Sequence, residues 1–316
     1  MPLDVVKQRM KLMGNQFEIS VVAKQTAWAN QCINQAVAEI KRVEKLLTTF
    51  LDDSETNLIN KAAGLYPVQV SEETYRLIER SIRISKLTQG AFDVTYGSID
   101  KDLWNFNLKM QKLPDTATAK KMVRLINYKN IILNENNFSV FLKHEGMRIG
   151  FGGIGKGYAA DRAKQVLLQC GVESGIVNAS GDLTAWGLQP NGQQWTIGIA
   201  HPDAANAVFS YFNISNMAVA TSGNYEKFIW IDGKKYSHTI NPKTGLPVTG
   251  IKSVTIITTH AEIADAMATP VTIMGIEAGL HMINQMNNIE AIIVDDNNRV
   301  FTSDHIHIQQ PKLLKK

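Results

Sequence analysis

A glycine-rich loop with a single lysine has the clearest chemical potential in this sequence. It runs from Gly150 to Gly157 and carries Lys156 where a helix is expected to begin. Glycines let the backbone approach a ligand closely, and a helix N-terminus offers unpaired N–H groups and a positive dipole end. Phosphate is the ligand that best suits such a loop, and the lysine adds a full positive charge. The sequence therefore predicts a strand, a phosphate-binding turn and a helix start.

Three interpretations of this loop compete. The dinucleotide pattern G-x-G-x-x-G fits from Gly150 to Gly155, but the next strand, at residues 175–180, ends without the acidic residue that this fingerprint requires. The P-loop pattern fits from Gly150 to Lys156, but Gly157 occupies the position of its magnesium-binding Ser or Thr. The third interpretation is a tight turn before an ordinary helix. The loop alone does not decide among the three.

A second candidate is the pair Asp265 and Thr269, which stand four residues apart in the segment A-D-A-M-A-T. On a helix, side chains at this spacing point the same way. A carboxylate and a hydroxyl on one face suit Mg²⁺, which binds a few oxygen ligands and keeps several waters. An Asp that caps a neighbour and a Thr that bonds to its own helix would give the same pattern. Metal binding and a structural role both remain open at this point.

The composition is typical of a globular protein, with 44% hydrophobic and 20% charged residues in a chain of 316. A net charge of +4 gives no reason to expect nucleic acid as a partner. The two cysteines, Cys32 and Cys170, show no metal or disulfide spacing. No apolar stretch approaches about 18 residues, so we expect no integral membrane segment. The first residues lack a signal-peptide core, which predicts a cytoplasmic protein as the sequence stands, or a periplasmic or membrane-anchored one if a signal segment has been removed.

The elements that must position these residues follow from hydrophobic periodicity. We predict helices at 27–50, 71–90, 161–170, 261–274 and 276–286. We predict strands at 17–22, 131–133, 138–142, 147–151, 175–179, 195–200, 209–214, 228–231, 253–258 and 290–294. This order predicts an α+β fold, a single compact domain at residues 11–303 with helices packed on antiparallel sheet. Residues 1–10 would be an N-terminal extension and 304–316 a C-terminal tail.

Six motifs, taken in order along the chain, resemble the ApbE family, the Mg²⁺-dependent FAD:protein FMN transferases. They are Lys11–Gly14; Phe50 with Ser54, Glu55 and Asn60; Ala91-Phe92-Asp93 followed by Leu103-Trp104; Gly152–Tyr158; Ser237–Gly245; and Ala264–Thr269. The resemblance implies an ApbE-like, T-fold-related fold. It also implies an enzyme that transfers the FMN moiety of FAD to a Ser/Thr hydroxyl of an acceptor flavoprotein and releases AMP.

The resemblance further implies roles for individual residues. Asp265 and Thr269 would bind Mg²⁺ by their side chains and Gly153 by its carbonyl, and catalytic roles fall to Asp265, Thr269, Lys156 and His238. The residues that would line the FAD site are Met13, Phe50, Ala91, Phe92, Asp93, Lys156, His238 and Ile240. The acceptor's own D-x-x-[ST]-G-A-[ST] motif is not found in the sequence. A pyrophosphatase that gives FMN and AMP, or a non-catalytic FAD-binding protein, would share these features.

Four positions depart from the family pattern. Phe50 stands where many members have Tyr, and Gly150 stands six residues before the lysine, where an Asp is frequent. Asn15 replaces a usual Thr. Pro270 follows the second proposed metal ligand, where it removes one helical hydrogen bond and is expected to kink the helix.

Overall fold

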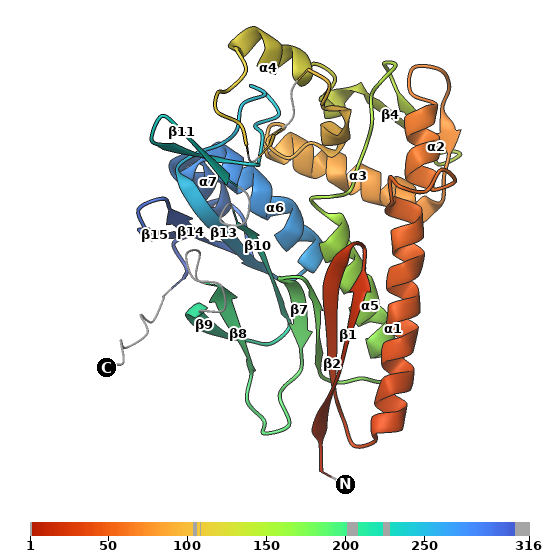
Figure 1. Cartoon of the computed structure of the whole chain (residues 1–316). Coiled ribbons are helices and arrows are strands. Elements are labelled where there is room, and N and C mark those ends of the chain that lie inside the picture. Colours follow the sequence, from red (N-terminus) through yellow and green to blue (C-terminus); the bar gives the residue numbers. More distant parts are fainter. Residues whose placement is uncertain (1, 104–105, 108, 201–207, 224–227, 307–316) are drawn as a thin grey trace.

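Eight strands form the central antiparallel sheet of the computed structural model, which describes residues 2–103, 106–107, 109–200, 208–223 and 228–306 (Figure 1). From one edge to the other they are β1 (Asp4–Leu12), β2 (Asn15–Ala23), β6 (Gly175–Ala179), β7 (Asp182–Trp186), β10 (Met217–Gly223), β13 (Ile251–Thr258), β14 (Ile289–Asp295) and β15 (Val300–Thr302). Neighbouring strands are antiparallel throughout, as the sequence predicted.

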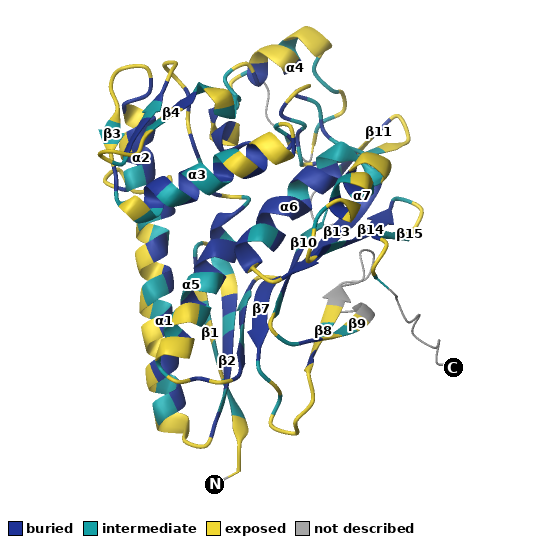
Figure 2. Ribbon diagram, turned by 180° about the vertical axis from the view of Figure 1, so that it is seen from behind, coloured by how far each residue is buried: buried dark blue, intermediate teal, exposed yellow. Residues whose placement is uncertain are grey.

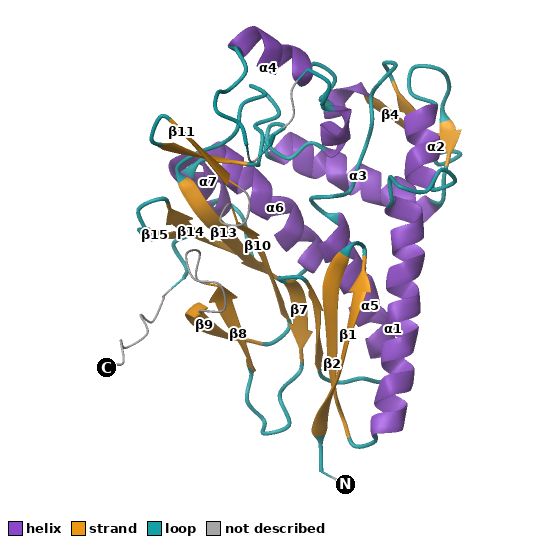
Figure 3. Ribbon diagram, viewed as in Figure 1, coloured by secondary structure: helices purple, strands orange, loops and turns teal. Residues whose placement is uncertain are grey.

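Four helices cover one face of this sheet, as Figure 3 shows. They are α1 (Thr26–Leu47), α5 (Gly155–Gln169), α6 (Ala261–Met274) and α7 (Ile276–Asn284). They lie in that order, α1 against β1 and β2, α5 against β6 and β7, α6 against β10 and β13, and α7 against β14. Helix α1 buries Ile33, Ile40 and Leu47, which recur along one face of the helix as a period of 3.6 residues requires. The predicted α+β fold is therefore confirmed.

The remaining elements lie at one end of the helix layer or on the opposite face of the sheet (Figure 1). At the end lie α2 (Glu55–Lys61), α3 (Glu72–Leu87), α4 (Thr116–Met122), the 3₁₀ turns η1 (Val94–Ser98) and η2 (Tyr128–Asn130), and a sheet of β3 (Val68–Gln69), β5 (Ser139–Leu142) and β4 (Ile131–Asn134). The hairpin of β8 (Trp195–Ala200) and β9 (Val208–Ile214) lies on the opposite face of the sheet (Figure 1). The hairpin of β11 (Phe228–Ile231) and β12 (Lys234–Ser237) lies at the same end as α4.

Strand β13 shows how the layers close the core. All eight of its residues are buried, so it appears uniformly dark in Figure 2. Helix α6 covers one of its faces, while Ile257 on the other joins an apolar cluster with Leu183 and Trp195. None of the helices in the described part of the chain combines the length and apolarity that crossing a membrane requires.

Some predicted elements differ from the structure. The strand predicted at 147–151 is wrong, because this segment is a loop. The side chains at 147, 149 and 151 are buried in alternation, as in a strand. Among the described residues, however, the backbone N–H and carbonyl groups of this segment do not form hydrogen bonds with a neighbouring strand. The Asn60 side chain bonds both the N–H and the carbonyl of Ile149, and the Gly150 N–H donates to the Val94 carbonyl. The chain is thereby free to turn directly into α5, which begins at Gly155 and not at Asp161.

Strands β1, β7 and β10 were not predicted. Strand β1 pairs with β2 over its whole length, from Asp4 opposite Ala23 to Leu12 opposite Asn15, so residues 4–10 belong to the central sheet. Charged residues alternate in β1, which lies at the sheet edge, and this pattern obscured it. Helix α6 continues through Pro270 to Met274, and Gly275 at φ 87° ends it.

Candidate active site

The N-terminus of α5 approaches α6 more closely than a side chain would allow. A Cβ added to Gly157 would lie 2.0 Å from the carbonyl oxygen of Ala261, the first residue of α6. This approach lets the Gly157 N–H donate to Asp265 Oδ2 at 3.0 Å. Gly157, which the P-loop pattern could not explain, is thus required for the contact between the two helices.

Lys156 lies between two buried carboxylates. Its ammonium nitrogen is in direct contact with Asp182 Oδ2 and lies 3.4 Å from Asp265 Oδ1. The three residues come from α5, β7 and α6, so this cluster joins the sheet to the helix layer. The structure therefore brings together Lys156 and Asp265, two of the residues to which the family resemblance assigned roles.

The electrostatics of the cluster favour a further cation. Burial, and then repulsion from Asp265, raise the pKa of Asp182 to about 6, even though Lys156 and the Thr221 N–H stabilise its charged form. Burial opposes the charge of Lys156, but attraction to the two carboxylates outweighs it and raises the pKa of this lysine. At neutral pH, two carboxylates therefore share one ammonium, and the cluster keeps one excess negative charge.

Thr269 is half-buried and lies one turn after Asp265 on α6. Because of this spacing, the Thr269 hydroxyl and the Asp265 carboxylate lie along one side of the helix. Among the described residues, no group of three or more His, Cys, Asp or Glu side chains could hold a metal. A metal at α6 would therefore need backbone carbonyl or hydroxyl ligands, and a carboxylate with a hydroxyl is a donor set suited to Mg²⁺.

Gly153 and Phe92 meet in front of α5. A Cβ added to Gly153 would lie 3.6 Å from the Phe92 ring. Phe92 and Ala91 are buried, in the turn between α3 and η1. The loop at 152–153 and the segment at 91–93, which both belong to the predicted site, thus lie together in the fold.

Asp93 organises the backbone around this turn. Its Oδ1 accepts from the N–H of Thr95 at 2.8 Å and from the Thr95 hydroxyl at 2.6 Å, and its Oδ2 accepts from the Tyr128 N–H at 2.9 Å. Burial raises the pKa of Asp93 despite these hydrogen bonds. Both oxygens are engaged within the protein, so the described contacts of the Asp93 side chain are structural.

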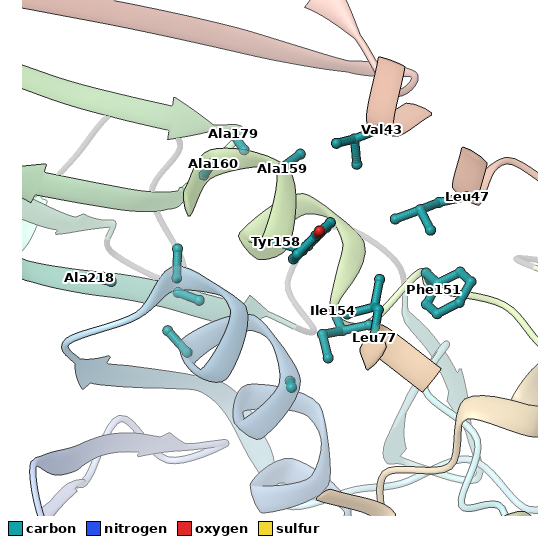
Figure 4. Packing of buried hydrophobic residues seen from close by; sticks show 14 of the residues in the cluster. Val43, Leu47, Leu77, Phe151, Ile154, Tyr158, Ala159, Ala160, Ala179 and Ala218 are labelled. Carbon is teal, nitrogen blue, oxygen red and sulfur yellow. The ribbon is translucent and has the colours of Figure 1, made fainter. Parts of the chain in front are cut away.

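Met13 lies at the turn between β1 and β2, with φ at 50°. An added Cβ on Gly155 would be 3.7 Å from Met13 Cε, so this side chain reaches the start of α5. On the apolar side of α5, Tyr158 belongs to one buried cluster with Leu77 and with Val43 and Leu47 of α1 (Figure 4). This apolar cluster therefore fixes the position of the N-terminus of α5, where Lys156 lies.

Phe50 is 95% exposed, in the turn after α1. Asn57 fixes this turn by donating to the carbonyls of Thr49 and Leu51. Ser54 caps α2, and Glu55 accepts from the backbone and hydroxyl of Ser71. The motif at 50–60 therefore exposes the Phe50 ring to solvent on a turn that side-chain hydrogen bonds stabilise.

His238 and Ile240 lie in a loop held between α4 and η1. His238 is exposed, with its ring centroid 6.4 Å from that of Phe106. Ile240 is buried, packs near Met122 of α4, and hydrogen-bonds through its backbone to the Tyr96 hydroxyl. In the predicted Leu-Trp element, Leu103 packs on the same cluster and Trp104 lies outside the described residues.

Sequence reasoning missed two acidic residues. The sequence analysis assigned no role to Asp182, the first residue of β7. The sequence cue that could have indicated Asp182 is its position directly after the turn at Ser180 and Gly181, at the start of an otherwise uncharged segment. In the structure both turn residues have positive φ and all of β7 is buried. Asp161 accepts from the N–H groups of Ala261 and Glu262 and so caps α6 from α5. Its partner is about 100 residues away, and no local pattern indicates it.

Comparison with known proteins agrees with this geometry. The ApbE family model matches residues 13–293. An FAD:protein FMN transferase from Klebsiella pneumoniae is 33% identical over 294 residues, which cover 92% of this chain and 90% of that protein. The crystal structure of the ApbE protein from Thermotoga maritima superposes with a TM-score of 0.84 at 30% identity and covers 95% of this chain and 97% of that one. The flavin transferase ApbE from Vibrio cholerae has a TM-score of 0.80 at 25% identity, with 96% and 98% of the two chains covered. The chain belongs to the ApbE family.

Proposed function

We propose that this protein is an FAD:protein FMN transferase, which joins the FMN moiety of FAD to a Ser or Thr hydroxyl of an acceptor flavoprotein. The observation that carries the proposal is the cluster of Lys156, Asp182 and Asp265 at the N-terminus of α5. This cluster groups an ammonium, a helix N-terminus and two buried carboxylates within one small volume. Such a group suits a pyrophosphate substrate that binds together with a cation. The names of the related enzymes support the same activity.

Mg²⁺ is the metal that we propose for this site. Asp265, Thr269 and the Gly153 carbonyl would hold it, and the excess negative charge beside Lys156 supports a divalent cation there. When bound, Mg²⁺ would neutralise the FAD pyrophosphate and stabilise the departing AMP. These hard oxygen donors fit the metal without a cluster of carboxylates.

The protein's own residues would orient the substrate. Lys156 would hold the pyrophosphate at the start of α5, while Met13, Phe50, Ala91, Phe92, His238 and Ile240 would line the flavin and adenosine regions. Asp93 would contribute by fixing the turn that carries Phe92. In the transfer, the acceptor hydroxyl oxygen forms a bond to the FMN phosphorus and loses its proton. The pyrophosphate P–O bond breaks, and AMP leaves with the bridging oxygen.

The test is incubation with FAD, Mg²⁺ and a peptide that contains D-x-x-T-G-A-T, followed by mass spectrometry of the peptide. We expect the peptide to gain FMN less one water, with one AMP released for each peptide modified. A peptide with Ala at the acceptor Thr is the control and should remain unmodified. Release of FMN and AMP with an unmodified acceptor peptide would indicate a pyrophosphatase. FAD binding without AMP release would indicate a carrier protein.

A further inference from the structure

The two cysteines lie opposite each other across the contact between α1 and α5. Cys32 is on α1 and is 2% exposed, whereas Cys170 forms the C-cap of α5 and is half-buried. Both line one surface cavity of about 310 Å³, together with Trp28, Gln31, Gln35, Val166 and Gln169. The 15 residues of α5 separate Cys170 from the start of the helix, a distance of about 22 Å at the α-helical rise.

The environments of the two thiols differ. Cys170 Sγ donates to Gln35 Oε1 at 3.0 Å and is accessible from the cavity. Burial, and then electrostatic and hydrogen-bond interaction with Cys170, raise the pKa of Cys32 to about 11. The shared cavity brings the two thiols near each other, and Cys32 is protonated at neutral pH. An incoming reagent would meet Cys170 first.

We propose that Cys32 and Cys170 form a thiol modification site, which a small-molecule disulfide oxidises to an intramolecular disulfide between α1 and α5. The Cys170 thiolate attacks the reagent RS–SR, forms a Cys170–S–SR mixed disulfide and releases one RS⁻. Cys32 then loses its proton and attacks the Cys170 sulfur, which releases the second RS⁻. The two cysteines are oxidised, the reagent is reduced to two thiols, and the two cysteine protons pass to the departing thiolates. The second step is the slower one at neutral pH, because only a small fraction of Cys32 is thiolate.

The cross-link would stabilise the fold without altering the active site. It joins positions about 140 residues apart in the sequence, and a disulfide that closes a long loop restricts the unfolded chain most. We expect the melting temperature of the oxidised protein to rise by about 5 °C or more. The affinity for FAD should change by less than about twofold, because the cross-link is at the far end of α5 from Lys156.

The experiment treats the full-length protein with oxidised glutathione and follows the products by intact mass and non-reducing peptide mapping. We expect wild type to lose two hydrogens in mass and to yield a peptide pair linked through Cys32 and Cys170. The pair should form faster at pH 9 than at pH 7, since the slow step needs the Cys32 thiolate. The Cys32→Ala variant should stop at a glutathione adduct on Cys170, and Cys170→Ala should remain unmodified.

Wild-type protein that keeps glutathione on Cys170 while Cys32 stays free would overturn the proposal, as would linkage only between two copies of the chain. Neither result depends on a variant, so a poorly folded Cys32→Ala protein would not obscure the outcome. The Cys32→Ala/Cys170→Ala protein controls for the melting temperature and should show no shift on oxidation.

Discussion

Gly157 lies against Ala261 so closely that the two helices α5 and α6 touch through their backbones. The contact aligns the Gly157 N–H with the Asp265 carboxylate. It thereby sets the position of Asp265 relative to Lys156, and the site depends on a residue that has no side chain.

Gly157→Ala should separate the helices. A methyl group 2.0 Å from a carbonyl oxygen forces a backbone shift, and we expect the free energy of unfolding to fall by about 3 kcal/mol and FAD turnover to be lost. Gly152→Ala is the matched control for stability, since no described atom beyond its chain neighbours lies within 4 Å of its added Cβ. Urea unfolding and AMP release measure both effects. Wild-type stability in Gly157→Ala would contradict the close contact.

Asp265→Ala and Asp265→Asn separate metal binding from structure. Loss of a metal-binding carboxylate should lower FAD cleavage on the order of a thousandfold in both variants at saturating Mg²⁺. Only the alanine variant leaves the Gly157 N–H without its acceptor, so only that variant should also melt at a lower temperature. Near wild-type turnover in either variant would refute the metal assignment.

Lys156→Met should weaken the fold as well as FAD binding. It leaves Asp182 and Asp265 buried without their shared ammonium, and we expect a loss of about 3 kcal/mol in the free energy of unfolding. Adding Asp182→Asn should restore at least half of this loss, because it removes one of the uncompensated charges. Calorimetric titration with FAD and urea unfolding test both variants. If the two substitutions act additively on stability, Lys156 and Asp182 are not coupled.

FAD should bind more tightly than FMN or riboflavin. Only FAD carries the pyrophosphate that the start of α5, with Lys156, would hold. Parallel calorimetric titrations with the three flavins in the presence of Mg²⁺ measure the difference, which we expect to be at least about tenfold. Equal affinities would mean that the loop at 150–157 does not contact the phosphates.

The free energy of unfolding should fall in acid because of the ion pairs around Arg42. Hydrogen bonds from Arg42 are the main reason that the pKa values of Glu39 and Glu73 are lowered. A lowered carboxylate pKa stabilises the fold fully above the ordinary glutamate value of about 4.3, and this stabilisation is lost as the pH falls through the lowered values. Melting temperatures from pH 7 to pH 3 measure the effect, and Glu73→Gln should lessen the decline. If the melting temperature of Glu73→Gln fell as much as that of wild type between pH 7 and pH 3, the proposed contribution of the Arg42–Glu73 ion pair would be contradicted.

The sequence predicted those features that local patterns encode. The apolar periodicity of α1 is local, as is the spacing that places Asp265 and Thr269 one turn apart on α6, and both helices form as predicted. Asp182 could not be assigned, because its partner Lys156 comes from another element and only the folded sheet brings them together. The loop at 147–151 was mistaken for a strand because burial alternates there, while its backbone bonds to a side chain, Asn60, far away in the sequence.

Helix α6 is attached to α5 at two points, at its first turn by the Asp161 carboxylate and one turn later by the Asp265 carboxylate. Two attachments along one axis prevent rotation as well as sliding, so the two helices behave as one rigid body. The spacing between Lys156, the proposed phosphate ligand, and Asp265, the proposed metal ligand, is then fixed when the chain folds, before any nucleotide arrives. Phe50 and His238, two exposed residues of the proposed FAD site, lie outside this pair of helices, so the attachment does not fix their positions.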